Sequence, residues 1–279
     1  MNDANPLTLE FSQTSLQDFL DCPRRFELSV LQEMRWPAAH SAPLLKFEEL
    51  TEIGSKFHHL CHQFFLGIDP DLLSSSLINP EISELWDSFL PYGKSLQHLP
   101  GYYEQILRIP FENHFLVAKF DLIVQQGDND YLIIDWKTAS KKPSKSILAN
   151  RVQTFLYPYI FQGAGGELFG AEKISPTEIT LQYWYPLAGI PEEVFPYSDA
   201  THQEVTQNIS DLIQQIYELI DADKPFPLTN DRQHCKYCIY RSYCERGHLT
   251  SSVPAGTELE QEDLSNVHFD LDLIKEIEF

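Results

Sequence analysis

Two carboxylates and one amine lie close together near the middle of the chain. Asp135 and Lys137 end the run 131–137, and Asp121 precedes that run. Side chains alternate along a strand, so Asp135 and Lys137 project from one face and Trp136 from the other. A turn between the two strands brings Asp121 beside Asp135, and two carboxylates at that distance imply a shared divalent cation.

That arrangement suits metal-assisted hydrolysis of a phosphodiester. The cation would neutralise charge on the phosphate and lower the pKa of a bound water, while Lys137 would position the water or stabilise the developing charge. The alternative is that Asp135 and Lys137 form a solvated ion pair at a strand end, which contributes little. The triplet alone favours the ion pair, so the assignment depends on the surrounding chain.

Apolar periodicity predicts the elements that must position these groups. Ser15 with Asp18 three residues later predicts a helix start. Helices are expected over 15–32 (bent at Cys22 and Pro23), 47–66, 81–97, 147–162 and 201–220, and strands over 106–112, 115–125, 131–137 and 178–185. The first three strands read as an antiparallel meander, so the fold class is α/β with a central sheet flanked by helices.

We expect four regions along the chain. These are a helical N-terminal region, a catalytic core, a cysteine region and a flexible acidic tail, over 1–100, 101–222, 223–249 and 250–279. From Gly256 onward Lys275 is the only lysine or arginine among many acids, which predicts a solvated end. Interleaved apolar residues leave open a docking segment or a cover over a basic groove.

Composition limits the classes of function. The chain has 41 acidic and 20 basic residues and a net charge of −21, which argues against a protein that coats nucleic acid. No apolar run approaches the roughly 20 residues that span a bilayer, and the start lacks a signal peptide. We therefore expect a cytoplasmic protein with no membrane partner.

The cysteines are spaced as metal ligands. Cys235, Cys238 and Cys244 lie close together, and Cys22 supplies a fourth thiolate if the two ends of the chain meet. A reducing cytosol disfavours disulfides, so the set predicts zinc or an iron–sulfur cluster. Four thiolates most often bind zinc. Cys61 is expected to be a buried apolar residue.

The order of several motifs resembles the PD-(D/E)XK nuclease superfamily, in its RecB-like branch. The motifs are Phe120-Asp121, Asp135-Trp136-Lys137 and the Q-x-x-x-Y run from Gln153 to Tyr157, preceded by a G-x-x-x-H run that ends at His58. The resemblance implies a restriction-endonuclease-like core. It departs at Ala118, where the family usually has Gly.

The resemblance also implies roles for individual residues. A Mg²⁺ or Mn²⁺ ion would be bound by His58, Asp121, Asp135 and the backbone carbonyl of Trp136. Lys137 would assist hydrolysis, and Gln153 and Tyr157 would contact DNA or support the site. Glu104 is a weaker metal-ligand candidate. His59 and His62 are expected to be structural.

The same resemblance favours an iron–sulfur cluster over zinc as the metal bound by the cysteines. Members of the branch join a single cysteine in a Phe-x-x-Cys-Pro helix to a C-terminal C-x2-C-x5-C run and bind a [4Fe–4S] cluster. Here the ligands would be Cys22, Cys235, Cys238 and Cys244, with zinc as the alternative. Those members include a helicase–nuclease repair subunit and the nuclease of CRISPR adaptation, so a helicase or a CRISPR adaptation protein is an expected partner.

The basic residues after the catalytic strand are candidate DNA contacts. They are Lys141, Lys142, Lys145 and Arg151, and ordinary solvated lysines are an equally good interpretation. The function expected from the whole chain is a metal-dependent exonuclease acting on single-stranded DNA or a free end, in repair, recombination or CRISPR-type processing. The second hypothesis is a non-catalytic iron–sulfur module of a larger DNA-binding complex. An electron-transfer protein is disfavoured, because it does not explain the acid and lysine motifs.

Overall fold

The computed structural model describes residues 8–36 and 42–246, with the side chains of 42–48 excluded. The expectations for the first residues and for the acidic tail lie outside this part. Among the described residues, no helix combines the length and the apolar character needed to cross a membrane. The chain forms two compact units, one built from residues up to 17 together with 53–224, and one from residues 18–52 and from 225 onward.

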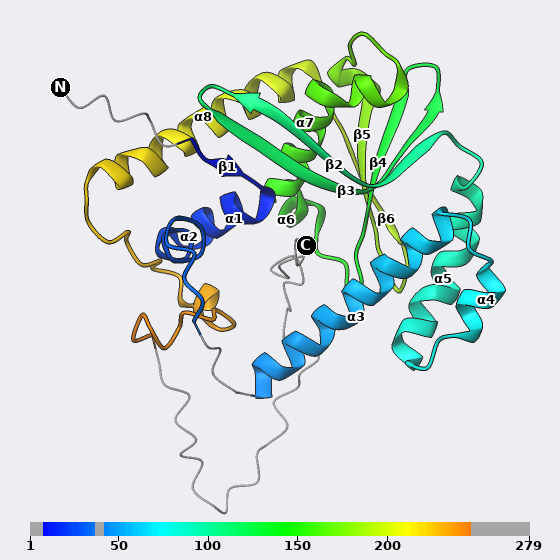
Figure 1. The fold of residues 1–279 in the computed structure, drawn as a ribbon, viewed down its shortest axis with the longest axis horizontal. Coiled ribbons are helices and arrows are strands. Elements are labelled where there is room, and N and C mark those ends of the chain that lie inside the picture. The colour runs from blue at the N-terminus through cyan, green and yellow to red at the C-terminus, as the bar shows by residue number, and fades with distance from the viewer. Residues whose placement is uncertain (1–7, 37–41, 247–279) are drawn as a thin grey trace, which may run out of the picture. The chain divides into compact units, whose positions relative to one another are not determined.

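The larger unit is organised around one mixed sheet of six strands (Figure 1). Its strands are β1 (Glu10–Phe11), β2 (Gly101–Phe111), β3 (His114–Gly127), β4 (Asp130–Trp136), β5 (Ile179–Trp184) and β6 (Glu192–Pro196). β2 pairs along almost the whole length of β3. β1 and β4 share the other edge of β3, β1 near Phe115 and β4 from Leu122 onward. The long strand β3 therefore pairs with three other strands.

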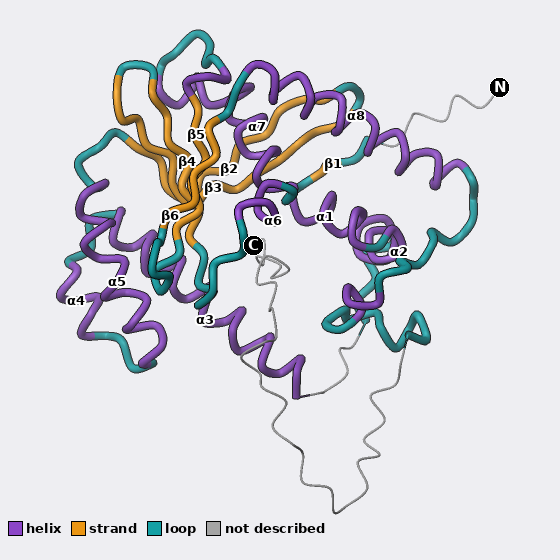
Figure 2. Tube along the Cα trace, turned by 180° about the vertical axis from the view of Figure 1, so that it is seen from behind, coloured by secondary structure: helices purple, strands orange, loops and turns teal. Residues whose placement is uncertain are grey.

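Helices cover both faces of this sheet (Figure 2). They are α3 (Ala42–Phe65), α4 (Pro70–Ser75), α5 (Pro80–Leu96), α6 (Lys145–Ala149), α7 (Val152–Phe169) and α8 (Asp199–Asp221), with a 3-10 turn, η2, at Pro176–Glu178. On one face, Tyr131 of β4 contacts Phe161 and Phe169 of α7. On the other face, Trp136 of β4 contacts Phe89 of α5. Odd-numbered and even-numbered side chains of β4 thus point to opposite faces of the sheet and contact different helices.

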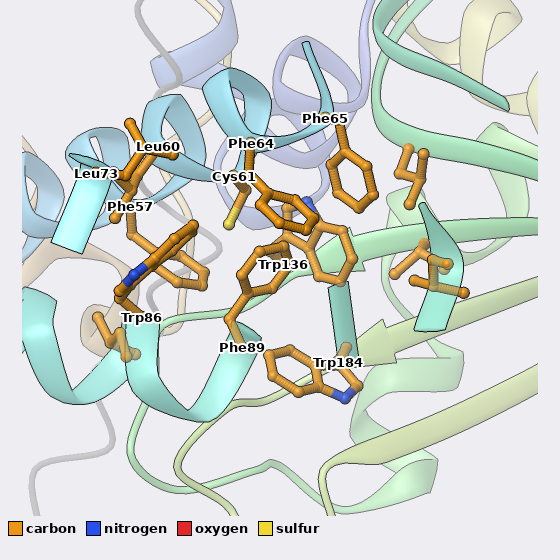
Figure 3. Close-up of a cluster of buried hydrophobic side chains, with 14 of the residues drawn as sticks. Phe57, Leu60, Cys61, Phe64, Phe65, Leu73, Trp86, Phe89, Trp136 and Trp184 are labelled. Carbon is orange, nitrogen blue, oxygen red and sulfur yellow. The ribbon is translucent and has the colours of Figure 1, made fainter. Parts of the chain in front are cut away.

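An aromatic core joins α3, α4 and α5 to the sheet (Figure 3). Trp136 stacks on Phe65 at 6.3 Å and meets Phe89 edge-on at 5.2 Å between ring centroids. Trp184 of β5 lies 5.8 Å from Trp136 in a T-shaped pair. Such pairs each contribute about 0.5–1.5 kcal/mol beyond burial of area. They fix the strand end that carries Asp135 and Lys137.

The smaller unit is held by a separate aromatic core. Its elements are the last residues of α1 (Gln13–Asp21), α2 (Pro23–Phe26), a π-helical turn η1 (Glu27–Leu31), the first residues of α3 and a 3-10 turn η3 (Arg232–Cys235). Phe226 stacks on Phe26 at 6.4 Å and packs edge-on against Phe19 at 6.5 Å. The Phe226 backbone N–H also donates to the Glu27 carboxylate at 2.8 Å. Segments distant in sequence are therefore joined by contacts on both sides of Cys22.

Most predicted elements are confirmed, with two corrections. The antiparallel meander is β2, β3 and β4, and the helices expected over 81–97 and 201–220 are α5 and α8. The single bent helix over 15–32 is wrong, because Pro23 has no N–H to continue α1 and instead starts α2. The single helix over 147–162 is also wrong. Its extended residue Arg151 separates α6 from α7.

Two short elements, α4 and β6, carry no strong periodic signal and were not expected. The helix start assigned to Ser15 is two residues late. Ser12 is the capping residue, since its hydroxyl accepts the Ser15 N–H at 3.2 Å. The buried environment expected for Cys61 is confirmed, at 1% exposure.

Candidate active site

One register row across the sheet carries five polar residues. Glu104, Asp121, Asp135, Tyr183 and Glu193 stand side by side on β2, β3, β4, β5 and β6, and we call them the polar row. Asp135 is paired with Tyr183, and Tyr183 with Glu193. Glu104 and Asp121 occupy the facing positions between two regular pairs of β2 and β3. Register within β2–β3 and within β4–β5–β6 therefore aligns residues that are distant in sequence, and the row continues across the gap between β3 and β4.

The strands β3 and β4 separate where this row crosses them. Their pairing ends at Leu122 and Ile134, one residue before Asp121 and Asp135. Beyond that point the Asp121 carboxylate takes the place of a backbone acceptor and receives the Trp136 N–H at 2.8 Å. The Asp121 side chain thus continues the hydrogen bonding between β3 and β4 by one bond after their backbone pairing has ended.

Three side chains converge at this opening in a way that suits a cation. One donor atom from each of His58, Glu104 and Asp121 lies within 4.8 Å of the other two. His58 Nδ1 is 3.1 Å from Asp121 Oδ1. Two carboxylate oxygens and an imidazole nitrogen are ligands that Mg²⁺ and Mn²⁺ accept. The donor set therefore fits a divalent cation.

The electrostatics of Asp121 keep its carboxylate ionised. Burial by itself would raise the pKa of Asp121, but the neighbouring His58, the Trp136 N–H and the ammonium of Lys137 together hold that pKa below its ordinary value. A carboxylate that is charged while 5% exposed is costly unless cations or donors surround it. Asp121 is thus prepared to bind a cation near neutral pH.

Glu104 is held in an unusual backbone conformation. Its φ of 50° lies in the left-handed region although it is not glycine, in the middle of β2. Such a residue costs on the order of 1–3 kcal/mol. Its carboxylate is ion-paired with Lys119 of β3. Glu104 thus joins His58 and Asp121 in the set of possible metal ligands, which we call the donor set, from a distorted point of β2. The alternation of a regular strand does not predict such a position.

Beside the donor set, Asp135 and Gln153 hold the side chain of Lys137. The Lys137 ammonium is 2.9 Å from Asp135 Oδ2 and donates to Gln153 Oε1 at 2.8 Å. The Gln153 amide donates in turn to Asp135 Oδ1. One ion pair and two hydrogen bonds join the three side chains into a closed ring between β4 and the first turn of α7. In the described residues Asp135 belongs to this ring and not to the His58 donor set.

The other residues expected around the site lie in the core. Trp136 is buried in the aromatic core behind Asp135 and Lys137. Tyr157 is also buried, with its ring 4.8 Å from Phe120. Tyr157 therefore supports the strand that carries Asp121. His59, in contrast, is exposed on the surface of α3.

The basic residues after β4 include a clamp on the sheet edge. Lys142 lies 3.0 Å and Lys145 3.3 Å from the Glu193 carboxylate, and Lys145 also donates to the Val194 carbonyl at 2.7 Å. These bonds attach the segment after β4 to β6. Lys141 is exposed, and Arg151 is partly buried at the start of α7. Their role as DNA contacts stays a prediction.

The four cysteines lie within the smaller unit. The pKa of Cys238 is raised to about 11, mainly by burial; the thiols of Cys22 and Cys244 add to the rise and Arg25 opposes it. Burial raises the pKa of Cys244, and the thiols of Cys22 and Cys235 raise it as well. All four thiols are thus near enough to interact electrostatically. Among the described residues, no three of their sulfur atoms come within 4.8 Å of one another.

Tyr183 and Glu193 were not anticipated from sequence. Tyr183 follows Leu181 and Ile179 in the alternation of β5, which would predict a core residue and nothing more. Glu193 lies in a strand without periodic signal. Their positions beside Asp135 follow only from strand order.

Comparison with known proteins agrees with these motifs. A family model described as the PD-(D/E)XK nuclease superfamily matches residues 10–245. A search of curated proteins finds no match.

Two solved structures resemble the chain at low identity. One, from Eubacterium rectale, bears the name "putative exonuclease"; it is 13% identical with a TM-score of 0.51, and the match covers 88% of this chain and 93% of that one. The other, SSO0001, is 15% identical with a TM-score of 0.38, and 88% of each chain is covered. At these identities the first supports the fold alone.

Proposed function

Because the chain belongs to the PD-(D/E)XK nuclease superfamily, we propose that it is a divalent-metal-dependent deoxyribonuclease that degrades DNA from an end. The observation that carries the proposal is the polar row. In this row Glu104 and Asp121, which form the donor set together with His58, stand next to Asp135, which is ion-paired with Lys137. A superfamily member that had lost its chemistry would need neither a partly buried lysine nor two buried carboxylates at this place.

Each residue has a distinct task in this proposal. His58, Glu104 and Asp121 would hold Mg²⁺ or Mn²⁺, with Asp135 and the Trp136 carbonyl as further ligands. The bound ion would neutralise charge on the scissile phosphate and acidify a water molecule. Lys137 offers an ammonium N–H to the water or to the phosphate oxygen that gains charge. Asp135 and Gln153 keep that ammonium oriented before substrate arrives.

We also propose that Cys22, Cys235, Cys238 and Cys244 bind a [4Fe–4S] cluster. The support for this proposal is the sequence. Phe19-Leu20-Asp21-Cys22-Pro23 and the spacing of Cys235, Cys238 and Cys244 match the two halves of the motif that binds such a cluster in the RecB-like branch, and zinc is the alternative. The cluster's task would be to join the two sequence segments of the smaller unit.

The cellular setting that we propose is the cytoplasm, in DNA repair, recombination or CRISPR-type processing. A helicase or a CRISPR adaptation protein would supply the DNA end. The alternative is a non-catalytic iron–sulfur module of a DNA-binding complex. The paired Asp135 and Lys137 argue for catalysis over that alternative.

Incubation of the full chain with end-labelled DNA tests the proposal. We expect Mg²⁺ or Mn²⁺ to support release of nucleotides from linear single-stranded or double-stranded DNA, EDTA to abolish it, and circular DNA to resist. Lys137→Ala should reduce the rate by about 10²–10⁴-fold, since general acid–base and charge-stabilising groups contribute that much. Lys94→Ala, an exposed lysine of α5, is the matched control. Intact DNA under every metal would refute the enzyme and leave the non-catalytic module.

A further inference from the structure

Tyr183 lies directly against the lysine of the proposed site. It stands beside Asp135 in the parallel pairing of β4 and β5 and is 1% exposed. The Lys137 ammonium is 5.3 Å from the centre of the Tyr183 ring. An ammonium within about 6 Å of an aromatic face is attracted by the ring's negative charge distribution. The ring is therefore a contact of Lys137 in addition to those with Asp135 and Gln153.

The Tyr183 hydroxyl is fixed from the opposite direction. It lies 2.8 Å from Thr154 Oγ1, and Thr154 Oγ1 donates its own proton to the Leu148 carbonyl. The Tyr183 O–H must therefore be the donor toward Thr154. An edge-on contact with Phe195 of β6, at 5.8 Å, limits rotation of the ring.

The first turn of α7 thus holds both Lys137 and Tyr183. Gln153 accepts a hydrogen bond from Lys137, and the next residue, Thr154, accepts one from Tyr183. Because the hydroxyl is already engaged with Thr154 and buried, it is not available to substrate. Any contribution of Tyr183 must act through its ring on Lys137.

We propose that Tyr183 is a positioning residue, whose ring holds the Lys137 ammonium in the orientation that hydrolysis requires. This inference rests on the proposed role of Lys137. Among the contacts of Lys137 it differs from those with Asp135 and Gln153 because it is independent of hydrogen bonding. The ring restricts the ammonium through its face and forms no hydrogen bond with it.

Chemical reactivity of Lys137 tests the inference without substrate or metal. The full-length protein is treated with acetic anhydride, and acetylation of Lys137 is followed by peptide mass spectrometry. We expect Tyr183→Leu to raise the acetylation rate about five- to tenfold, and Tyr183→Phe, which retains the ring, to stay within about twofold of wild type. Tyr131→Leu is the matched control, since Tyr131 is buried on β4 but packs against Phe161 and Phe169.

Steady-state kinetics give the second readout. With the DNA substrate and Mg²⁺, kcat should fall about tenfold in Tyr183→Leu while KM stays within about twofold, and Tyr183→Phe should lose less than about threefold. Equal acetylation rates in Tyr183→Leu and Tyr131→Leu would overturn the inference. So would a Tyr183→Phe variant as impaired as Tyr183→Leu, because the ring would then not be the cause.

Two measures keep the outcome decisive. If Tyr183→Leu does not fold, as judged by circular dichroism, Tyr183→Met replaces it, since a long unbranched side chain fills irregular space. If the wild type has no nuclease activity, the proposed function fails, but the acetylation rates still decide whether the ring orients Lys137. The two failures are therefore distinguishable.

Discussion

The donor set in the sheet and the four cysteines of the smaller unit differ in what holds them. His58, Glu104 and Asp121 converge within 4.8 Å, because two lie in paired strands and the third in a helix packed on an aromatic core. The cysteines lie in short turns and at helix ends, and their sulfur atoms stay farther apart. The fold therefore brings the ligand atoms of the donor set together, whereas we expect a bound metal to hold the four cysteines in place.

The largest effect should come from removing a donor in the sheet. Asp121→Asn should reduce nuclease rate by about 10³-fold, since the charge that binds the cation is lost. The metal-free midpoint of thermal unfolding should shift by only a few degrees, because an amide oxygen still accepts the Trp136 N–H. A large loss of metal-free stability would contradict the idea that the fold arranges this site.

The opposite pattern is expected for the cysteines. Cys235→Ser in protein purified without oxygen should remove visible absorption near 400 nm and speed amide hydrogen exchange of α2 by about tenfold or more, because the metal joins the segments. Exchange in β3 and β4 should not change. Cys61→Ser is the control for cysteine loss, as Cys61 lies in the aromatic core of the larger unit. Absorption retained in Cys235→Ser would exclude the cluster, and zinc in its place would be found by elemental analysis.

Two variants of Glu104 measure how much backbone strain at this position costs in stability. Glu104→Gln and Glu104→Gly should both weaken Mn²⁺ binding about 10–100-fold by calorimetry, since each lacks the charged ligand. Only glycine accepts the φ of 50° without strain, so Glu104→Gly should be more stable than Glu104→Gln by about 1 kcal/mol. Equal stability of the two variants would mean that the strand is not strained there.

The smallest effect concerns the attachment of β1 to the sheet. His114 Nδ1 accepts the Leu9 N–H at 3.4 Å, and burial lowers the pKa of His114 despite the opposing effect of Glu112. A lowered folded-state pKa means that this contribution to stability is complete above about pH 6.5 and is lost as the pH falls through the folded value.

The measurement is a comparison of thermal midpoints between pH 7.5 and pH 5.5. The wild type should lose about 1–3 °C more than His114→Asn, which retains an acceptor but does not titrate. An identical pH response in both proteins would show that His114 does not hold β1.

Part of the site could be predicted from sequence, and the reason is strand geometry. Alternation placed Asp135 and Lys137 on one face and Trp136 on the other, as found. The meander placed Asp121 near Asp135. Glu104 was only a weak candidate, since its position depends on a positive φ that no periodic pattern reveals.

What the sequence determined by itself was local. Residue types and their spacing fixed the strands of the meander, the charged triplet on β4 and the grouping of cysteines at two ends of the chain. The tertiary structure alone decided that β5 and β6 follow β4, so that Tyr183 and Glu193 complete the polar row. It also decided that the Asp121 side chain replaces a backbone acceptor where two strands part. Hydrogen bonding between strands has no counterpart in sequence spacing, because it joins residues according to sheet order and not according to chain distance.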